Sequence, residues 1–264
     1  MKHALIGMLI LVSAACAPQT YYNVATQRQE TYYYSEEREV AMGKSLSREV
    51  ARQFPADTDL LDQQRLRAIG AAIVAVSDRK NIEYTFTLID KDEVNAFAIP
   101  GGYVYVFRGL WDKIRDSDDK IAAVLAHEIA HITARHTVKR LQDALGYGSL
   151  AILAQITPGA DMRSRVYAQQ GIRELLLSYS REEELEADML AAKYLQEAGF
   201  SPQGMLDVLA LLQQTQRARP AGPAHVQTHP YIPERQRAVR QTVNRGEIEF
   251  NDYINSGLKP GAPL

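Results

Sequence analysis

The chain of 264 residues lacks the features that mark several protein classes. Cys16 is its one cysteine, so no intramolecular disulfide can form. The net charge is −2, with 30 basic and 32 acidic residues, so no excess of positive charge favours nucleic acid as a partner. No apolar run reaches the roughly 20 residues that a membrane-spanning helix needs. The hydrophobic content of 46% is ample for the core of one domain.

The one long apolar run near the start covers residues 4–15 and follows a lysine. A run of about twelve apolar residues is typical of a signal-peptide core, so we predict that residues 1–15 are a signal peptide. Ser13-Ala14-Ala15-Cys16 then resembles a lipoprotein cleavage site, which predicts lipidation of Cys16. Cleavage after Ala17, leaving a free protein, is the alternative. Because Ala17 is not an aspartate, we expect sorting to the outer membrane in a Gram-negative cell.

The remaining chain divides into three parts. Residues 16–37 are polar and rich in tyrosine, and we predict a tether from the lipid to a folded domain. Its tyrosines would either pack on that domain or lie at a membrane interface. Residues 38–245 are predicted to form one domain, and residues 246–264 a C-terminal tail.

Hydrophobic periodicity within the domain predicts helices, then a small sheet, then more helices. The first two helices are expected over residues 38–54 and 60–77, and the strands over residues 82–89, 94–98 and 103–107. Residues 110–219 are expected to be mostly helical, followed by a proline-rich loop over 219–233 and a last helix over 234–244. This order is typical of an α+β domain in which a helix packs against a small sheet.

One motif, His127-Glu128-Ile129-Ala130-His131, carries most of the chemical information. Positions i and i+4 share a face of a helix, so both imidazoles can reach one metal ion. Glu128 follows the first histidine and can reach a water on that ion. Zinc prefers nitrogen ligands in a tetrahedral shell, and an open fourth position makes such a site catalytic. The motif therefore predicts a zinc hydrolase, in the first place a peptidase.

The surroundings of the motif favour a buried helix. The apolar residues before and within it recur at helical spacing, namely Ile121, Val124, Leu125, Ile129 and Ile132. Ser117 with two aspartates after it is typical of a helix start, and no glycine or proline interrupts residues 118–138. We predict one helix over 118–138. The alternative is two surface histidines on an ordinary amphipathic helix.

Two histidines leave one protein ligand to be found. A third histidine in the run H-E-x-x-H-x-x-G-x-x-H is excluded, since Ala134 and Thr137 occupy the positions of its glycine and histidine. A later acidic run offers Glu184 and, four residues on, Asp188. Glu184 would bind the zinc, while Asp188 would accept the outer N–H of a zinc histidine and fix its tautomer.

The alternative for this acidic run is a solvated helix face. Ala191 and Leu195 continue the face of Glu184 and Asp188, which favours an inward orientation. The other glutamates of the run are expected at the surface, namely Glu182, Glu183 and Glu186.

Four segments together resemble the gluzincin peptidases related to HtpX and to the CAAX prenyl endopeptidase. Two are the histidine motif and the S-R-x-x-E-x-E-A-D run that ends at Asp188. The third, Asn95-Ala96-Phe97-Ala98-Ile99-Pro100-Gly101-Gly102, is similar to the family's N-A-F-A-x-P-G-G segment. The fourth is His229-Pro230 with Arg235, similar to its H-P-x-x-x-x-R segment. The four segments stand in the family's order.

The resemblance implies a mostly helical, zincin-like metallopeptidase domain over residues 38–245, with a small sheet packed on the zinc-binding helix. It implies one Zn²⁺ per chain, held by His127, His131 and Glu184. Unlike the integral-membrane members, the catalytic region has no membrane-spanning segment, so the chain resembles the soluble periplasmic branch. That branch includes lipoproteins and proteins of outer-membrane quality control, which makes outer-membrane assembly proteins candidate partners.

The predicted function is a zinc-dependent endopeptidase for unfolded or misassembled envelope proteins, held by a lipid at the periplasmic side of the outer membrane. A zinc-activated water would attack the peptide bond, with Glu128 as general base. By the family resemblance, His229 and Arg235 are candidates for donating hydrogen bonds to the oxyanion. His229 could instead occupy the fourth zinc position and block it, or be a loop histidine with no catalytic part.

Extended polypeptides are expected to pair with the strand at 94–98 through backbone hydrogen bonds, with Asn95, Ala96 and Phe97 as candidate contacts. Two other classes stay open. A chaperone-like binding module could use the same cleft with little or no cleavage, although binding alone needs no general base. A metal-dependent hydrolase of non-peptide bonds would use the same residues. His136 has no partner at a useful spacing and is assigned to structure or the surface.

Overall fold

The computed structural model describes residues 19–23, 28–32, 34–153, 162–218 and 229–245. The predicted signal peptide, Cys16 and the predicted tail lie outside the described residues, as does most of the predicted proline-rich loop. None of the described helices combines the length and the apolar character needed to cross a membrane.

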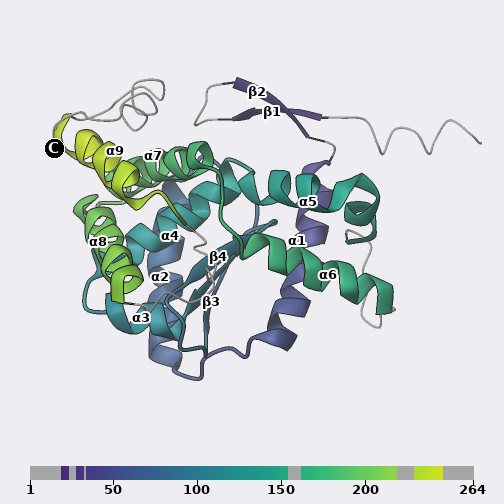
Figure 1. The fold of residues 1–264 in the computed structure, drawn as a ribbon, viewed down its shortest axis with the longest axis horizontal. Coiled ribbons are helices and arrows are strands. Elements are labelled where there is room, and N and C mark those ends of the chain that lie inside the picture. The colour runs from purple at the N-terminus through teal and green to yellow at the C-terminus, as the bar shows by residue number, and fades with distance from the viewer. Residues whose placement is uncertain (1–18, 24–27, 33, 154–161, 219–228, 246–264) are drawn as a thin grey trace, which may run out of the picture.

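Helices dominate the described residues and surround a small central sheet (Figure 1). The helices are α1 (Glu36–Gln53), α2 (Leu60–Val76), α3 (Arg108–Ile114), α4 (Asp118–Thr133), α5 (His136–Leu153), α6 (Met162–Leu175), α7 (Arg181–Glu197), α8 (Gln203–Ala218) and α9 (Ile232–Arg245). The strands are β1 (Gln19–Asn23), β2 (Arg28–Tyr32), β3 (Thr85–Ile89), β4 (Ala96–Ile99) and β5 (Tyr103–Phe107). The predicted fold, a mostly helical α+β domain, is confirmed.

The central sheet has the order β3-β5-β4. β3 runs parallel to β5, whereas β4 is antiparallel to it, so β4 is an edge strand. The tight turn between β4 and β5 uses Gly101 and Gly102, with φ of 78° and 95°, values that side chains rarely allow. β3 begins three residues later than the predicted strand, because its pairing with β5 starts only at Thr85.

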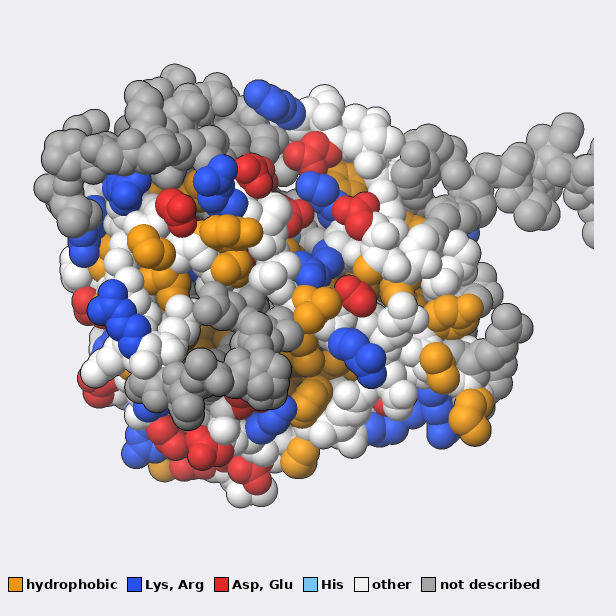
Figure 2. Space-filling model, in the orientation of Figure 1, with side chains coloured by type: hydrophobic (Ala, Val, Ile, Leu, Met, Phe, Trp, Pro, Cys, Tyr) orange, Lys and Arg blue, Asp and Glu red, His pale blue; other side chains and the backbone are white. Residues whose placement is uncertain are grey.

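Both faces of this sheet are covered. Alternate residues of the strands, such as Leu88, Ala98 and Val106, pack in one core with α2, α4, α7 and α8. The residues between them, such as Phe97 and Phe107, pack in a second core with α1, α5 and α6. α4, which carries the histidine motif, lies against β4 and between α7 and α8. The outer face shown in Figure 2 mixes lysine and arginine with aspartate and glutamate, whereas the ion pairs described below are buried.

The prediction of one continuous helix over 118–138 is wrong. α4 ends at Thr133, and α5 begins at His136 after a break in which Arg135 has a φ of 58°. Arg135 is buried and forms an ion pair with Glu39, which also accepts from Arg79 at 2.7 Å. This tertiary contact compensates a backbone conformation that costs a non-glycine residue free energy. The break turns His136 back toward the end of α4.

The segment predicted as a tether forms a β-hairpin, in which β1 pairs with β2 in antiparallel register. The Tyr21 ring lies 3.8 Å from the Arg135 guanidinium carbon. Tyr32 and Tyr34 are buried, while Tyr22 is exposed. Of the two alternatives for these tyrosines, packing on the domain therefore holds for Tyr21, Tyr32 and Tyr34. Whether the segment also tethers the domain stays a prediction.

Candidate metal centre

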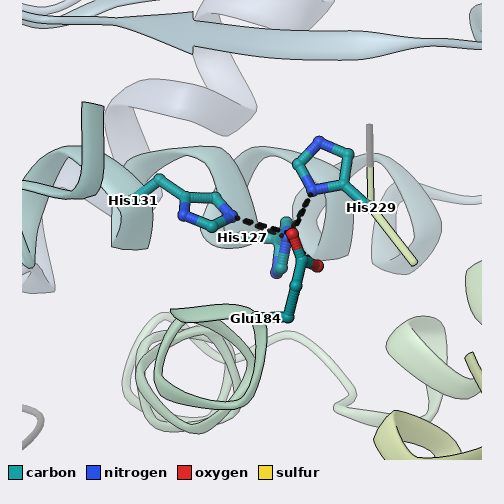
Figure 3. Close-up of side chains that lie close together, drawn as sticks. All are labelled: His127, His131, Glu184 and His229. Atoms are coloured by element: carbon teal, nitrogen blue, oxygen red, sulfur yellow. Dashed lines mark hydrogen bonds and ion pairs between the residues drawn. The ribbon is translucent and has the colours of Figure 1, made fainter. Parts of the chain in front are cut away.

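Three parts of the chain converge on one point inside the domain (Figure 3). His127 and His131 project from successive turns of α4, and Glu184 projects from the first turn of α7. The start of α7 is fixed by a capping box in which Ser180 and Glu183 bond to each other's backbone N–H groups. His229, just before α9, completes the group, and one ligand atom from each residue lies within 4.8 Å of the other three.

The distances between these atoms fit a tetrahedral zinc ion. Ligands at about 2.0–2.1 Å from such an ion lie roughly 3.3 Å from one another. His127 Nε2 lies 3.1 Å from His131 Nε2 and 3.2 Å from His229 Nδ1. The Glu184 carboxylate lies 3.0 Å from His229, 3.5 Å from His127 and 3.7 Å from His131. Three imidazole nitrogens and one carboxylate oxygen are also a donor set that zinc favours.

A second group of charges lies behind the ligand atoms. Asp188 Oδ1 lies 2.9 Å from His127 Nδ1, the nitrogen that faces away from the cluster. Arg235 of α9 donates from Nε and Nη2 to the two oxygens of Asp188, both at 2.7 Å. Its Nη1 lies 2.5 Å from Glu184 Oε2. Arg235 therefore holds both carboxylates of α7 in place.

Electrostatics keep these groups in the ionisation states that suit metal binding. Burial raises the pKa of Glu184, but Arg235 and His229 outweigh burial and hold that pKa well below its usual value. The same competition, with Arg235 again the main opponent of burial, lowers the pKa of Asp188. Burial, followed by the neighbouring His127, holds the pKa of His131 well below its usual value, so its imidazole is neutral. Burial lowers the pKa of His229, but Glu184 and Glu128 more than offset burial and raise it to about 10.

The comparison with protein families decides the relationship. The family described as Peptidase family M48 matches residues 60–243. The chain belongs to this family. The predicted resemblance to the gluzincin peptidases is therefore confirmed at the level of the family.

Curated relatives of this M48 domain are metallopeptidases by name. The β-barrel assembly-enhancing protease of Escherichia coli (strain K12) is 30% identical over 216 residues, which are 79% of this chain and 44% of that protein. The mitochondrial metalloendopeptidase OMA1 of Schizosaccharomyces pombe is 28% identical over 177 residues, 67% of this chain and 52% of that protein. Metalloprotease LoiP of Escherichia coli (strain K12) is 29% identical over 160 residues, 60% of this chain and 62% of that protein. The chain thus spans about half the length of these relatives.

Glu128 of the M48 motif lies beside the cluster. It is buried, and its Oε1 lies 3.3 Å from His229 Nε2. Its Oε2 has no hydrogen-bond partner among the described residues. One carboxylate oxygen is thus held while the other is free to accept a proton at the centre.

The residues predicted to contact substrate lie on or next to the edge strand. Ala96 and Phe97 belong to β4, and the backbone oxygen of Asn95 accepts from Phe107 N at 3.0 Å. The Phe97 ring is buried and stacks on Tyr105 with ring centres 4.9 Å apart. Because these side chains are buried, a peptide could pair only with the backbone here. Contact with a substrate stays a prediction.

Sequence analysis missed three residues that surround His131. His136 Nδ1 lies 2.9 Å from His131 Nδ1, and His136 Nε2 lies 3.0 Å from Glu186 Oε2. The ring of Tyr179 stacks on His131 with centres 4.0 Å apart, and its hydroxyl has no hydrogen-bond partner among the described residues. The expectation that Glu183 and Glu186 are surface residues is wrong, since each side chain is 12% exposed. No pattern in the sequence marks His136, because its position depends on the break at Arg135.

Proposed function

We propose that the chain is a zinc-dependent endopeptidase that cleaves unfolded or misassembled envelope proteins. The observation that carries the proposal is the cluster of three imidazoles and one carboxylate with Glu128 beside it. A binding module would need the cleft but not a buried carboxylate aimed at a metal centre. Membership of Peptidase family M48 supports the same reaction class.

Zinc is the proposed ion, one per chain, with His127, His131 and Glu184 as its permanent ligands. When bound, zinc would polarise the scissile carbonyl and lower the pKa of a water to around 7. Glu128 would take a proton from that water through its free oxygen and pass the proton to the leaving amine. Asp188 would fix the tautomer of His127, so that Nε2 keeps its lone pair for the metal.

For His229 we favour the fourth metal position over the role of oxyanion donor. Its Nδ1 lies 3.2 Å from His127 Nε2 and 3.0 Å from Glu184 Oε1, which is the spacing of a fellow ligand. In that position His229 blocks the site, and cleavage requires the segment before α9 to move away. Arg235 is engaged by Asp188 and Glu184, which supports a role in fixing these carboxylates. Donation from Arg235 to the oxyanion stays a prediction.

The proposed substrates are extended polypeptides that pair with β4 through their backbones. The edge position of β4 and its contact with α4 support this placement. We propose a periplasmic location with a lipid on Cys16 that inserts into the outer membrane. The apolar run at 4–15 supports this location, as does similarity to a protease whose name refers to β-barrel assembly. Outer-membrane assembly proteins are the proposed partners.

Metal analysis of the purified chain together with a casein digestion assay tests the function. We expect one zinc per chain, cleavage that a chelator abolishes, and recovery when zinc is added back. Zinc binding without cleavage, even in the His229→Ala variant, would favour the chaperone-like module. A chain that binds no divalent metal would overturn the proposal.

A further inference from the structure

The two histidines of the M48 motif receive different support on their outer nitrogens. His127 Nδ1 faces a carboxylate directly, since Asp188 Oδ1 lies 2.9 Å away. His131 Nδ1 faces the imidazole of His136, with 2.9 Å between the two Nδ1 atoms. A carboxylate stands behind that second ring as well, because His136 Nε2 lies 3.0 Å from Glu186 Oε2. Both metal-facing rings thus end at a carboxylate of α7, one directly and one through another histidine.

The direction of every hydrogen bond in this second chain follows from the proposed metal site. His131 must keep the lone pair on Nε2 for the metal, so its proton is on Nδ1. His136 Nδ1 then accepts that proton's hydrogen bond, which places the remaining proton of His136 on Nε2. This N–H donates to Glu186, an acceptor when ionised. No other arrangement of a neutral His131 satisfies both short contacts.

Burial makes this chain strong and sets its geometry. His131 is fully buried, His136 is 2% exposed, and the Glu186 side chain is 12% exposed. The hairpin covers the outer end, where Asn23 Nδ2 lies 3.5 Å from Glu186 Oε2 and 2.8 Å from Glu30 Oε1. Hydrogen bonds of buried imidazoles gain from the low dielectric around them, and a missing partner costs correspondingly more.

We propose that His136 and Glu186 are positioning residues that hold His131 in the tautomer and ring orientation needed to bind the metal. The inference rests on the proposed function in one respect, the role of His131 as ligand. It adds to that function a second support for the metal, built from two residues that touch neither the ion nor a substrate. The competing explanation is that His136 only fills space between α4, α5 and α7.

Two substitutions of His136 separate positioning from packing. Asparagine places its Oδ1 near the position of the histidine Nδ1 and still accepts from His131, whereas leucine fills the space without an acceptor. For His136→Leu we expect the zinc dissociation constant to rise by about 10- to 100-fold, the usual cost of losing such a partner. His136→Asn should show a clearly smaller rise. The readouts are competition with a chromophoric zinc chelator and thermal unfolding of the metal-free chain.

A matched pair of glutamates on α7 tests the outer end. Glu186→Gln keeps an acceptor for His136 but removes the charge, so zinc binding should weaken less than in His136→Leu. Glu182→Gln removes the same charge four residues earlier, where the side chain is 57% exposed, and should leave zinc binding unchanged. Because Glu186→Gln preserves shape, this comparison also stands if His136→Leu fails to fold.

The outcomes distinguish this inference from the proposed function. Folded His136→Leu protein that binds zinc as tightly as the wild type would overturn the positioning role while leaving the metallopeptidase intact. Equal losses in His136→Asn and His136→Leu would also overturn it, because the acceptor would then be irrelevant. A wild-type chain that binds no zinc would overturn both.

Discussion

Replacing Arg235 with methionine tests how the charges behind the metal ligands contribute to stability. The guanidinium is 4% exposed and lies within 2.7 Å of oxygens from both Asp188 and Glu184, which are fully buried. Its loss leaves two buried carboxylates without their shared cation. Breaking a buried ion pair costs about 3–5 kcal/mol, and about 2–4 °C of Tm is lost per kcal/mol in a domain near this size, so we expect Tm to fall by about 6–20 °C.

The assay is thermal and urea unfolding of the metal-free chain, followed by circular dichroism. Arg240→Met is the control, because this exposed arginine lies on the same helix and its loss should change stability by less than about 0.5 kcal/mol. Adding Asp188→Asn to the Arg235→Met variant should recover part of the loss, since one unpaired charge is then removed. A loss below about 1 kcal/mol for Arg235→Met would refute the reasoning, because the contacts would then be too weak to compensate two buried charges.

The pH dependence of this loss has a definite sign. The pKa values of Glu184 and Asp188 are lowered in the folded chain, so the stability they contribute is present above their unfolded values, near 4. That contribution is lost as the pH falls through the folded pKa values. The stability difference between wild type and Arg235→Met should therefore be largest near neutral pH and shrink in acid, as measured by urea unfolding at a series of pH values.

Three further substitutions test the catalytic centre and the packing beneath it. Glu128→Gln should lower kcat/KM for an unfolded substrate by about 10²- to 10⁴-fold with zinc content unchanged, and normal turnover would remove Glu128 as the base. His229→Ala should raise turnover if the imidazole blocks the fourth position; a fall would favour the oxyanion role, and no change would remove both. Gly43→Ala places a Cβ 1.9 Å from Pro100 O, so urea unfolding should show a loss of about 1–3 kcal/mol or more, whereas wild-type stability would mean that α1 does not approach the β4–β5 turn this closely.

The parts of the site that depend on helical periodicity could be predicted from the sequence. The i, i+4 spacing alone places His127 and His131 on one face of a helix, and the same spacing joins Glu184 to Asp188. The mostly helical α+β fold and the family followed from the same kind of pattern and are confirmed. Each of these predictions needs only the local geometry of the chain.

The parts that depend on tertiary contacts could not be predicted. The contact of His136 with His131 requires the left-handed backbone of Arg135, which is compensated by Glu39 on α1, 96 residues earlier in the chain. The pairing of Arg235 with Asp188 likewise requires α9 to pack on α7. Sequence spacing carries no signal for either arrangement, because each is decided by helices that meet only in the folded domain.

The separation of the ligands along the chain has a consequence for the order of folding. His127 and His229 are 102 residues apart, so the centre closes only after a loop of that length has been brought together. Until α7 and α9 dock, a partly folded chain offers a metal two imidazoles on one helix, without the carboxylate or its arginine. Tight uptake of an ion thus marks the final docking step, and a nascent or clipped chain stays inert as a protease.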